Sequence, residues 1–443
     1  MSDGLHGTQR ALAFLAVAIA VTMAVLDTSI VNIALPTLAQ ELAVTPSQAV
    51  WVVNAYQMAV TVCLLPLAVL GDQVGYKRVY GWGLALFALA SIACAAAPTL
   101  ALLACARAIQ GVGAAGIMSV NMALVRAIFP KAQLGAGMGY AAMVVSSASL
   151  AGPTVAAGIL TMASWHWLFL VNVPLGALAL LIGSRALPAS PTRPFRLDLA
   201  GALLNTLALG PLIAGLAALS EPGGLSSGML LVAAGVVAGA AFIRRELRAQ
   251  APMLPVDLLR MPVFRLSLAT SVCAFAATTM ALVALPFYLQ AQLGQSALEV
   301  GLVMTCWPLA STVVAPFAGR LSDRTTPTRM CVAGMVTLGA ALLSFSWMAA
   351  VPSMPDLAWR LILCGIGFAL FQSPNNRIII GSAPHNRSGG ASGLQSLGRL
   401  LGQSLGATMA SGVLALAGSM HALAACLYAA VLALAAAAAS SRR

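Results

Sequence analysis

Two side chains of opposite charge lie deep inside apolar stretches of this sequence. Asp27 lies within the first long apolar segment, and Arg107 lies within a later one. A charged side chain at the centre of a bilayer costs about 2.5–3.5 kcal/mol even on the mildest scale, so it is seldom retained for packing alone. A lone carboxyl group in an apolar surrounding is a simple means of binding and releasing a proton. The sequence therefore predicts that Asp27 and Arg107 couple the protein to protons.

The two side chains are expected at the same depth. If the first apolar segment ends near Pro36, Asp27 lies roughly 13 Å from the outer surface at 1.5 Å per helical residue. The segment that carries Arg107 begins near Thr99, which places Arg107 roughly 12 Å deep on the same geometry. An arginine nearby stabilises the charged carboxylate, whereas burial favours the neutral acid. A static ion pair that only joins two helices remains the alternative.

Other polar side chains inside apolar segments are candidates for a substrate cavity. Each of them could instead form a hydrogen bond between helices. Asn375 and Asn376 are the strongest, because the neighbouring Pro374 removes a backbone hydrogen bond. Arg399 has no evident acidic partner, and backbone carbonyls or Gln395 could satisfy it. The cavity candidates are Asn32, Asn54, Gln57, Gln110, Asn121, Tyr288, Gln372, Asn375, Asn376 and Gln395.

A short polar turn could act as a conformational latch. It contains Asp72, Gly75, Lys77 and Arg78, and the pair Asp323-Arg324 repeats its charge pattern in the second half of the chain. Glycine suits a tight turn, and the charged side chains can meet the ends of neighbouring helices. The alternative is a plain loop that only sets the orientation of the chain.

The apolar segment at 134–158 carries small residues around a proline. Pro153 removes a backbone hydrogen bond and favours a kink. Gly139 and Gly152 allow another helix to approach closely. A kinked, closely packed helix suits a surface on which two halves of a protein rock, and it is equally compatible with packing alone.

The composition indicates a polytopic membrane protein. The chain has 443 residues, of which 60% are hydrophobic and 8% are charged, whereas a soluble domain carries about 25% charged residues. The net charge of +12 is spread over short loops, which argues against nucleic-acid binding. No phosphate-binding loop and no hydrolase or zinc-protease motif occurs. The eight cysteines all lie in apolar stretches. We therefore expect no enzyme activity, no cofactor and no metal.

Hydrophobicity predicts fourteen transmembrane helices, because a span needs about 20 mostly apolar residues. Their approximate ranges are 11–35, 51–70, 79–97, 99–123, 134–158, 166–184, 198–219, 228–243, 264–289, 299–318, 330–350, 357–379, 390–415 and 421–440.

The positive charges predict the orientation. With the N-terminus in the cytoplasm, 20 of the 23 basic residues fall in inner segments, and the other three (Arg107, Arg360 and Arg399) lie within spans. The outer loops instead carry acidic residues, as the positive-inside rule requires. We expect a protein of a bacterial-type cytoplasmic (inner) membrane with both termini in the cytoplasm.

Two polar linkers divide the predicted spans into groups of six, two and six. This predicts an N-terminal six-helix bundle at 1–190, a linker with two extra helices at 191–262, and a C-terminal six-helix bundle at 263–443. Paired six-helix bundles are a known transporter design, with the substrate bound between them near the middle of the membrane.

The motifs resemble those of the major facilitator superfamily and, within it, the fourteen-span drug:proton antiporters. The similarity covers nearly the whole chain. It is carried by Leu26–Pro36, Asp72 with Gly75 and Lys77, Arg107–Ala115, Gly152-Pro153, Trp165–Pro174 and Asp323-Arg324. Some positions depart from the family pattern: alanine or threonine replaces glycine at Ala68, Ala148, Ala156, Ala157 and Thr326.

The resemblance implies an all-α membrane protein that works as a proton-coupled multidrug efflux transporter. It would export amphipathic, cationic or neutral organic compounds by alternating access, and its partners would be these solutes, protons and membrane lipid. We expect a monomer. Two alternatives stay open: a narrow-specificity carrier of one antibiotic or metabolite, or a non-transporting membrane receptor on the same fold.

Overall fold

The structure of the protein is a computed structural model whose described residues are almost entirely helical. No strand occurs among these residues, which confirms the all-α prediction. The described residues are 4–130, 133–189, 199–219, 224–248, 256–348, 352–382, 388–417 and 423–441.

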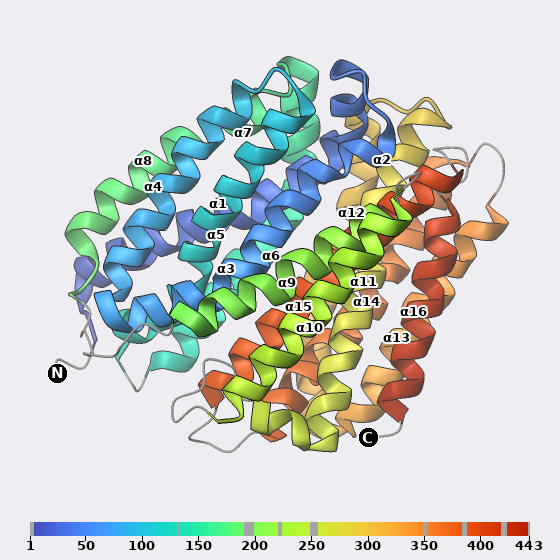
Figure 1. The fold of residues 1–443 in the computed structure, drawn as a ribbon. Coiled ribbons are helices and arrows are strands. Elements are labelled where there is room, and N and C mark those ends of the chain that lie inside the picture. The colour runs from blue at the N-terminus through green and yellow to red at the C-terminus, as the bar shows by residue number, and fades with distance from the viewer. Residues whose placement is uncertain are drawn as a thin grey trace. The chain divides into compact units, whose positions relative to one another are not determined.

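The first of two compact units contains Met1–Val31 and Trp51–Thr206. Figure 1 shows its helices in blue to green. They are most of α1 (Gly7–Glu41), α3 (Trp51–Val74), α4 (Tyr76–Ala95), α5 (Leu100–Ile128), α6 (Leu134–Met162), α7 (Trp167–Leu170), α8 (Asn172–Ala186) and the start of α9 (Leu199–Leu219).

The second unit contains Asn32–Val50 and Leu207–Arg443. It holds the end of α1 and the rest of α9. The elements that lie wholly within it are α2 (Pro46–Ala49), α10 (Leu225–Glu246), the 3-10 turn Val256–Arg260, α11 (Pro262–Ala291), α12 (Ala297–Arg324), α13 (Pro327–Ser344), the 3-10 turn Phe345–Trp347, α14 (Met354–Ser382), α15 (Ser388–Ala417) and α16 (Leu423–Ser441).

Every predicted span coincides with helix in the described part of the chain. Twelve helices there are long and apolar enough to cross a membrane. The apolar part of α9, Ala200–Leu216, is shorter. Helix α15 has 30 residues but carries many Gly, Ser and Gln residues, which lower its hydropathy. The chain is therefore a multi-pass membrane protein, whereas the count of fourteen and the three-part division stay predictions.

Two predicted spans differ in detail from the helices that contain them. Helix α1 continues through Pro36 to Glu41, because proline removes only its own hydrogen bond and a long helix can tolerate that loss. The span predicted at 166–184 matches the apolar segment Trp167–Ala186, but the helix is interrupted there at Val171, between α7 and α8. The interruption fits Pro174, which has no N–H to donate to the carbonyl of Leu170.

Glycine permits the closest helix contacts in both units. A Cβ atom at Gly113 of α5 would lie 2.6 Å from the backbone nitrogen of Phe87 in α4. A Cβ at Gly334 of α13 would lie 2.6 Å from the backbone nitrogen of Phe371 in α14. Membrane helices associate largely through such close backbone approach, because lipid provides no hydrophobic driving force between them.

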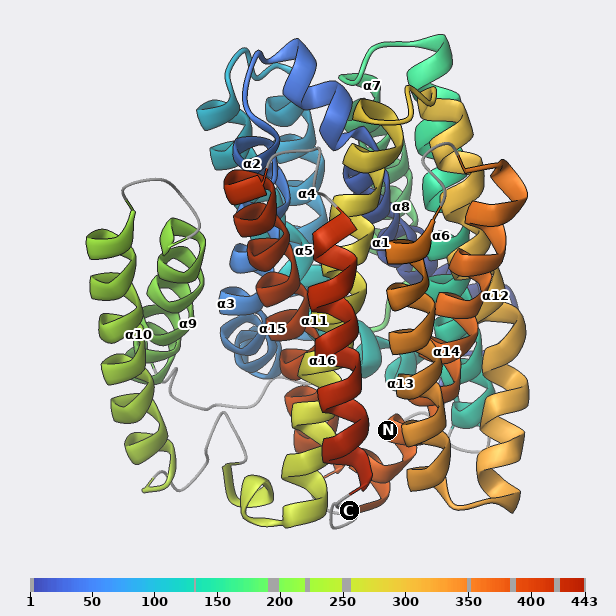
Figure 2. The same ribbon diagram turned by 90° about the vertical axis from the view of Figure 1, so that its right-hand side faces the viewer.

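Helices α9 and α10 form a hairpin of the same kind (Figure 2). A Cβ at Gly215 would lie 2.7 Å from the backbone nitrogen of Val232, and one at Gly235 would lie 2.7 Å from that of Leu212. At the start of the hairpin, the Asn205 side chain donates a 2.8 Å hydrogen bond to the carbonyl of Val62 in α3. A polar side chain thus joins the start of α9 to α3 within the first unit.

We predict that Gly113→Val destabilises the protein, because its side chain would overlap the backbone of α4. Overpacking of this kind costs about 1–3 kcal/mol. The matched control is Gly158→Val on α6, since a Cβ there meets no atom within 4 Å. Melting temperatures in detergent should fall for Gly113→Val alone, and an equal fall for both variants would contradict the packing argument.

Candidate functional site

The charged pair predicted from the sequence is an ion pair in the structure. Arg107 Nη1 on α5 donates to Asp27 Oδ2 on α1. Each side chain is only 1% exposed, so neither charge is solvated from outside. The predicted proximity of Asp27 and Arg107 is therefore confirmed by their contact. Helix α1, however, does not end at Pro36.

Two side-chain amides complete the surroundings of the carboxylate. Gln110 Nε2 donates to Asp27 Oδ1 at 3.0 Å, and Asn172 Nδ2 donates to the same oxygen at 3.2 Å. Gln110 also accepts a 2.6 Å bond from Arg107 Nη1 through its Oε1 atom. Donors on α5 and α8 therefore converge on one acid of α1.

The arginine is held from three further sides. Its Nε atom donates to the carbonyl of Val52 on α3 at 3.1 Å. Its guanidinium carbon lies 4.2 Å from the ring centroid of Tyr56 and 5.7 Å from that of Phe169. Cations are attracted to aromatic faces, most strongly where water is absent. The site thus orients the guanidinium in one direction, toward Asp27.

Sequence reasoning missed two members of this network. Asn172 is the first residue of α8, and Ser91 on α4 accepts a 2.9 Å bond from Gln110 Nε2. Both are buried. Asn172 belongs to the motif at Trp165–Pro174, but the motif does not show which way its side chain points. The helix break between α7 and α8 directs this side chain toward Asp27. Ser91 had no signal, since a serine in a membrane helix usually bonds to its own backbone.

Several predicted cavity residues of the first unit are buried without serving this pair. Asn54 on α3 is 1% exposed, and within the described residues neither of its amide atoms has a hydrogen-bond partner. Gln57 is also buried, and the Oδ1 atom of Asn121 has no partner among these residues. Buried amides without partners are costly and are typical of places that receive water or a ligand.

The predicted cavity residues of the second unit form separate contacts. Asn375 on α14 donates to Ser271 Oγ on α11 at 2.7 Å. Gln395 on α15 donates to Asn376 Oδ1 at 2.5 Å. The remaining candidates, Asn32, Tyr288 and Gln372, are buried or half-buried.

The predicted latch turn joins α3 and α4. Gly75 has a φ of +99°, which a side chain would make unfavourable. Tyr76 donates to Asp72 Oδ1 at 2.5 Å, and Lys77 Nζ donates at 2.9 Å to the carbonyl of Leu187, which follows α8. Arg78 bonds to the carbonyl of Val74. Lys77 and Arg78 thus meet the C-terminal ends of α8 and α3 as expected, whereas Asp72 binds a tyrosine hydroxyl and does not cap α4. A switching role stays a prediction.

The proline-containing helix α6 packs against α1 beside the ion pair. A Cβ at Gly152 would lie 2.3 Å from Ser29 Oγ, two residues after Asp27. Pro153 lies inside α6, which continues as a helix on both sides of it. A movement of α6 along α1 would therefore change the packing next to the Asp27 carboxyl group. The surroundings of Gly139 lie outside what is described.

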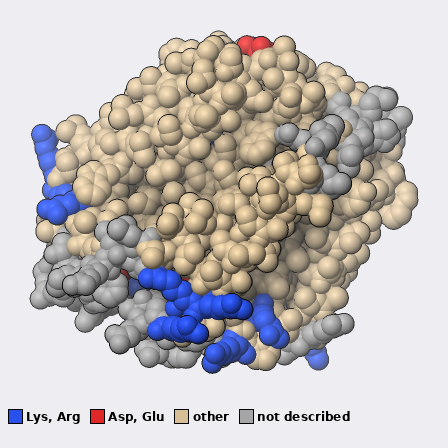
Figure 3. All heavy atoms as spheres, in the orientation of Figure 1, with Lys and Arg blue, Asp and Glu red and all other residues tan. Residues whose placement is uncertain are grey.

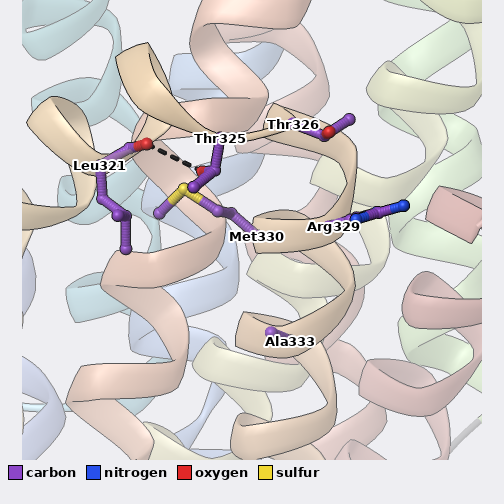
Figure 4. A pocket seen from close by; sticks show the side chains of 6 residues that line it. All are labelled: Leu321, Thr325, Thr326, Arg329, Met330 and Ala333. Carbon is purple, nitrogen blue, oxygen red and sulfur yellow. Dashed lines mark hydrogen bonds between the residues drawn. The ribbon is translucent and has the colours of Figure 1, made fainter.

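The second predicted latch lies at the end of α12, where the side chains of Asp323 and Arg324 lie outside the described residues. Beside them the turn between α12 and α13 is hollowed, and its lining residues include Leu321, Arg329 and Met330 (Figure 4). Thr325 donates to the carbonyl of Leu321 at 2.8 Å. This hollow is open and shallow, so we assign it no ligand.

We predict that Arg107→Leu lowers stability by about 3–5 kcal/mol, because it leaves a buried carboxylate without its counter-charge. Adding Asp27→Leu should restore most of the loss, since the unpaired charge is then removed as well. The measurement is the unfolding free energy of both variants in detergent. A double variant as unstable as the sum of the two single ones would contradict this account of the pair.

Comparison with known proteins agrees with the site and the fold. Residues 17–407 match the profile of the Major Facilitator Superfamily. The chain is 49% identical over 410 residues to the "Uncharacterized transporter YebQ" of Escherichia coli K12, covering 92% of this chain and 90% of that protein. It is 33% identical to the "Multidrug resistance protein Stp" of Mycobacterium tuberculosis, over 91% of this chain and 76% of Stp. It is 29% identical to the "Riboflavin transporter RibZ" of Clostridioides difficile, over 86% of this chain and 83% of RibZ. The chain therefore belongs to the Major Facilitator Superfamily and is a membrane transporter of small molecules.

Proposed function

We propose that this transporter is a proton-coupled exporter of amphipathic organic compounds that works by alternating access. The observation that carries the proposal is the fully buried pair of Asp27 and Arg107. An ionisable group inside the membrane marks a functional site by default, and carboxyl groups serve there as proton relays.

Protonation of Asp27 would act on several helices at once. The charged carboxylate accepts bonds from Arg107 and Gln110 on α5 and from Asn172 on α8. A neutral carboxyl group loses its attraction for the guanidinium and accepts these bonds more weakly. Proton binding therefore loosens α1 from α5 and α8 together, and proton release tightens them. A change of this kind can bias a two-state equilibrium between conformations.

The proton gradient provides enough free energy for this exchange. One proton moving inward yields about 2.3 kcal/mol per 100 mV of membrane potential and about 1.36 kcal/mol per unit of pH difference. At ~150 mV, one proton can sustain a gradient of a few hundredfold for a neutral solute. In this scheme Asp27 takes a proton from outside, releases solute there, and loses the proton to the cytoplasm.

The charge distribution supports a cytoplasmic (inner) membrane with both termini inside. On the face drawn in Figure 3, the described Lys and Arg side chains gather at the left edge and across the lower part, and a broad region above them shows no charged side chain apart from an acidic one at the upper edge. An uncharged belt of this kind suits the hydrocarbon layer, and basic residues favour the cytoplasmic side. The turn at Asp72–Arg78 would lie on that side, where its charges can latch the inner face.

The names of the relatives bear on substrate breadth. Stp is called a multidrug resistance protein, which supports a broad range of solutes, whereas RibZ is called a riboflavin transporter, which supports a single one. We favour broad export and keep a narrow carrier as the second candidate. A panel of chemically unlike compounds, tested for efflux with and without an uncoupler, separates the two.

The decisive experiment is solute-driven proton movement in proteoliposomes. We predict that Asp27→Asn abolishes this movement, because the amide cannot bind and release a proton, while the variant still folds and inserts. Asp27→Glu should retain part of the exchange, since it keeps a titratable carboxyl group.

The matched control is Asp356→Asn. Asp356 also pairs with an arginine, Arg360, but it lies at the start of α14 and is partly exposed. Its loss should leave solute-driven proton movement intact. Unimpaired exchange in Asp27→Asn, or equal loss in both variants, would reject the proposed role of Asp27.

A further inference from the structure

Arg399 lies in the interior of helix α15, and no acidic side chain among the described residues pairs with it. It lies eleven residues after Ser388, the first residue of α15, which is roughly 17 Å along the helix axis. Its side chain is half-buried. No hydrogen bond or ion pair joins it to any residue that the structure describes. A cation at such depth is costly unless something pairs with it.

The other two arginines that the sequence places within spans are both paired. Arg107 binds Asp27, and Arg360 binds both carboxylate oxygens of Asp356 at 3.1 and 3.2 Å. Arg360 also lies 4.7 Å from the ring centroid of Trp359. Arg107 and Arg360 thus each have a carboxylate partner, and Arg399 differs from them in this respect.

The residues around Arg399 form a polar stripe along α15. Gln395 and Gln403, one turn before and one turn after it, share its face at a spacing of four residues and are also half-buried. Gln395 reaches Asn376 on α14, and Gln372 lies one turn before Asn376. An arginine flanked by amides is well suited to bind an oxyanion, because all of these side chains can donate hydrogen bonds.

Glycine packing places α11 beside this stripe. A Cβ at Gly402 would lie 2.5 Å from the carbonyl oxygen of Val272 on α11, and one at Gly406 would lie 2.3 Å from that of Ala276. Gly402 and Gly406 follow Arg399 by three and seven residues, so they share its helical face. The backbone of α15 therefore rests on α11 at the edge of the stripe, and the half-buried Arg399 lies next to this contact.

We propose that Arg399 binds the carboxylate of an amphipathic organic acid, with Gln395 and Gln403 flanking the bound group. The missing counter-charge is then carried by the solute itself. Arginine favours this role because its planar guanidinium pairs with carboxylates through two parallel hydrogen bonds. The inference rests on the proposed transport function, and it revises the charge class expected from the sequence from cationic or neutral solutes to solutes with an acidic group.

The test is ligand-induced thermal stabilisation of the full-length protein in detergent. The probes are rhodamine B, which carries a carboxylate, with its ethyl ester, and a series of aromatic carboxylic acids, each with its methyl ester. We expect acids to stabilise the wild-type protein at concentrations about tenfold lower than their esters. Arg399→Gln should abolish this preference while leaving the response to the esters unchanged.

Two further variants keep the result interpretable. Arg399→Lys keeps the charge without the planar fork, so part of the preference should remain even if Arg399→Gln fails to fold. Arg329→Gln removes the same charge from an exposed position on α13 and should keep the full preference. The proposal is overturned if no acid stabilises the wild-type protein, if esters stabilise it equally, or if Arg399→Gln retains the preference.

This measurement is independent of proton flux, because it needs neither a membrane nor a gradient. Preferential binding of acids through Arg399 without solute-driven proton movement would contradict the proposed function and support this inference. Proton-coupled exchange without any preference for acids would do the reverse.

Discussion

The first unit is organised around a charged pair, Asp27 and Arg107, that is buried away from water. Asp27 and Arg107 are each only 1% exposed, and burial of either charge alone would be strongly unfavourable. The protein offsets this cost with directed contacts: two amides bind the carboxylate, and a carbonyl and two aromatic rings surround the guanidinium. Because these groups come from α3, α7 and α8 as well as from α5, the pair connects five helices of the first unit.

The same network explains how one proton can have a large effect. A neutral Asp27 no longer attracts Arg107, so several contacts weaken together rather than one at a time. The helices that meet here are also closely packed, with glycines at Gly113 and Gly152 where backbones or side chains nearly touch. Closely packed interfaces tend to shift between discrete arrangements instead of deforming gradually. A buried acid at such a junction is well placed to couple a proton to a conformational change.

The two units use arginine differently. In the first unit the arginine has its own carboxylate, and both side chains are only 1% exposed. In the second unit Arg399 lies on a polar stripe of α15 with no carboxylate among the described residues. Under our two proposals, one unit would respond to protons, and the other would offer a charge to a solute. Proton and solute would then bind to different side chains, and each could influence the other only through a change of conformation.

The sequence by itself determined the class of protein and the approximate positions of the helices. Composition and hydrophobic runs decide these, because lipid permits few alternatives to apolar helices. It also pointed to Asp27 and Arg107, since charge is rare in apolar segments. It did not reveal Asn172 or Ser91 as partners, nor that Arg360 pairs with Asp356. Those outcomes depend on helix rotation and on the break between α7 and α8, which arise from packing between distant segments and leave no mark in local sequence.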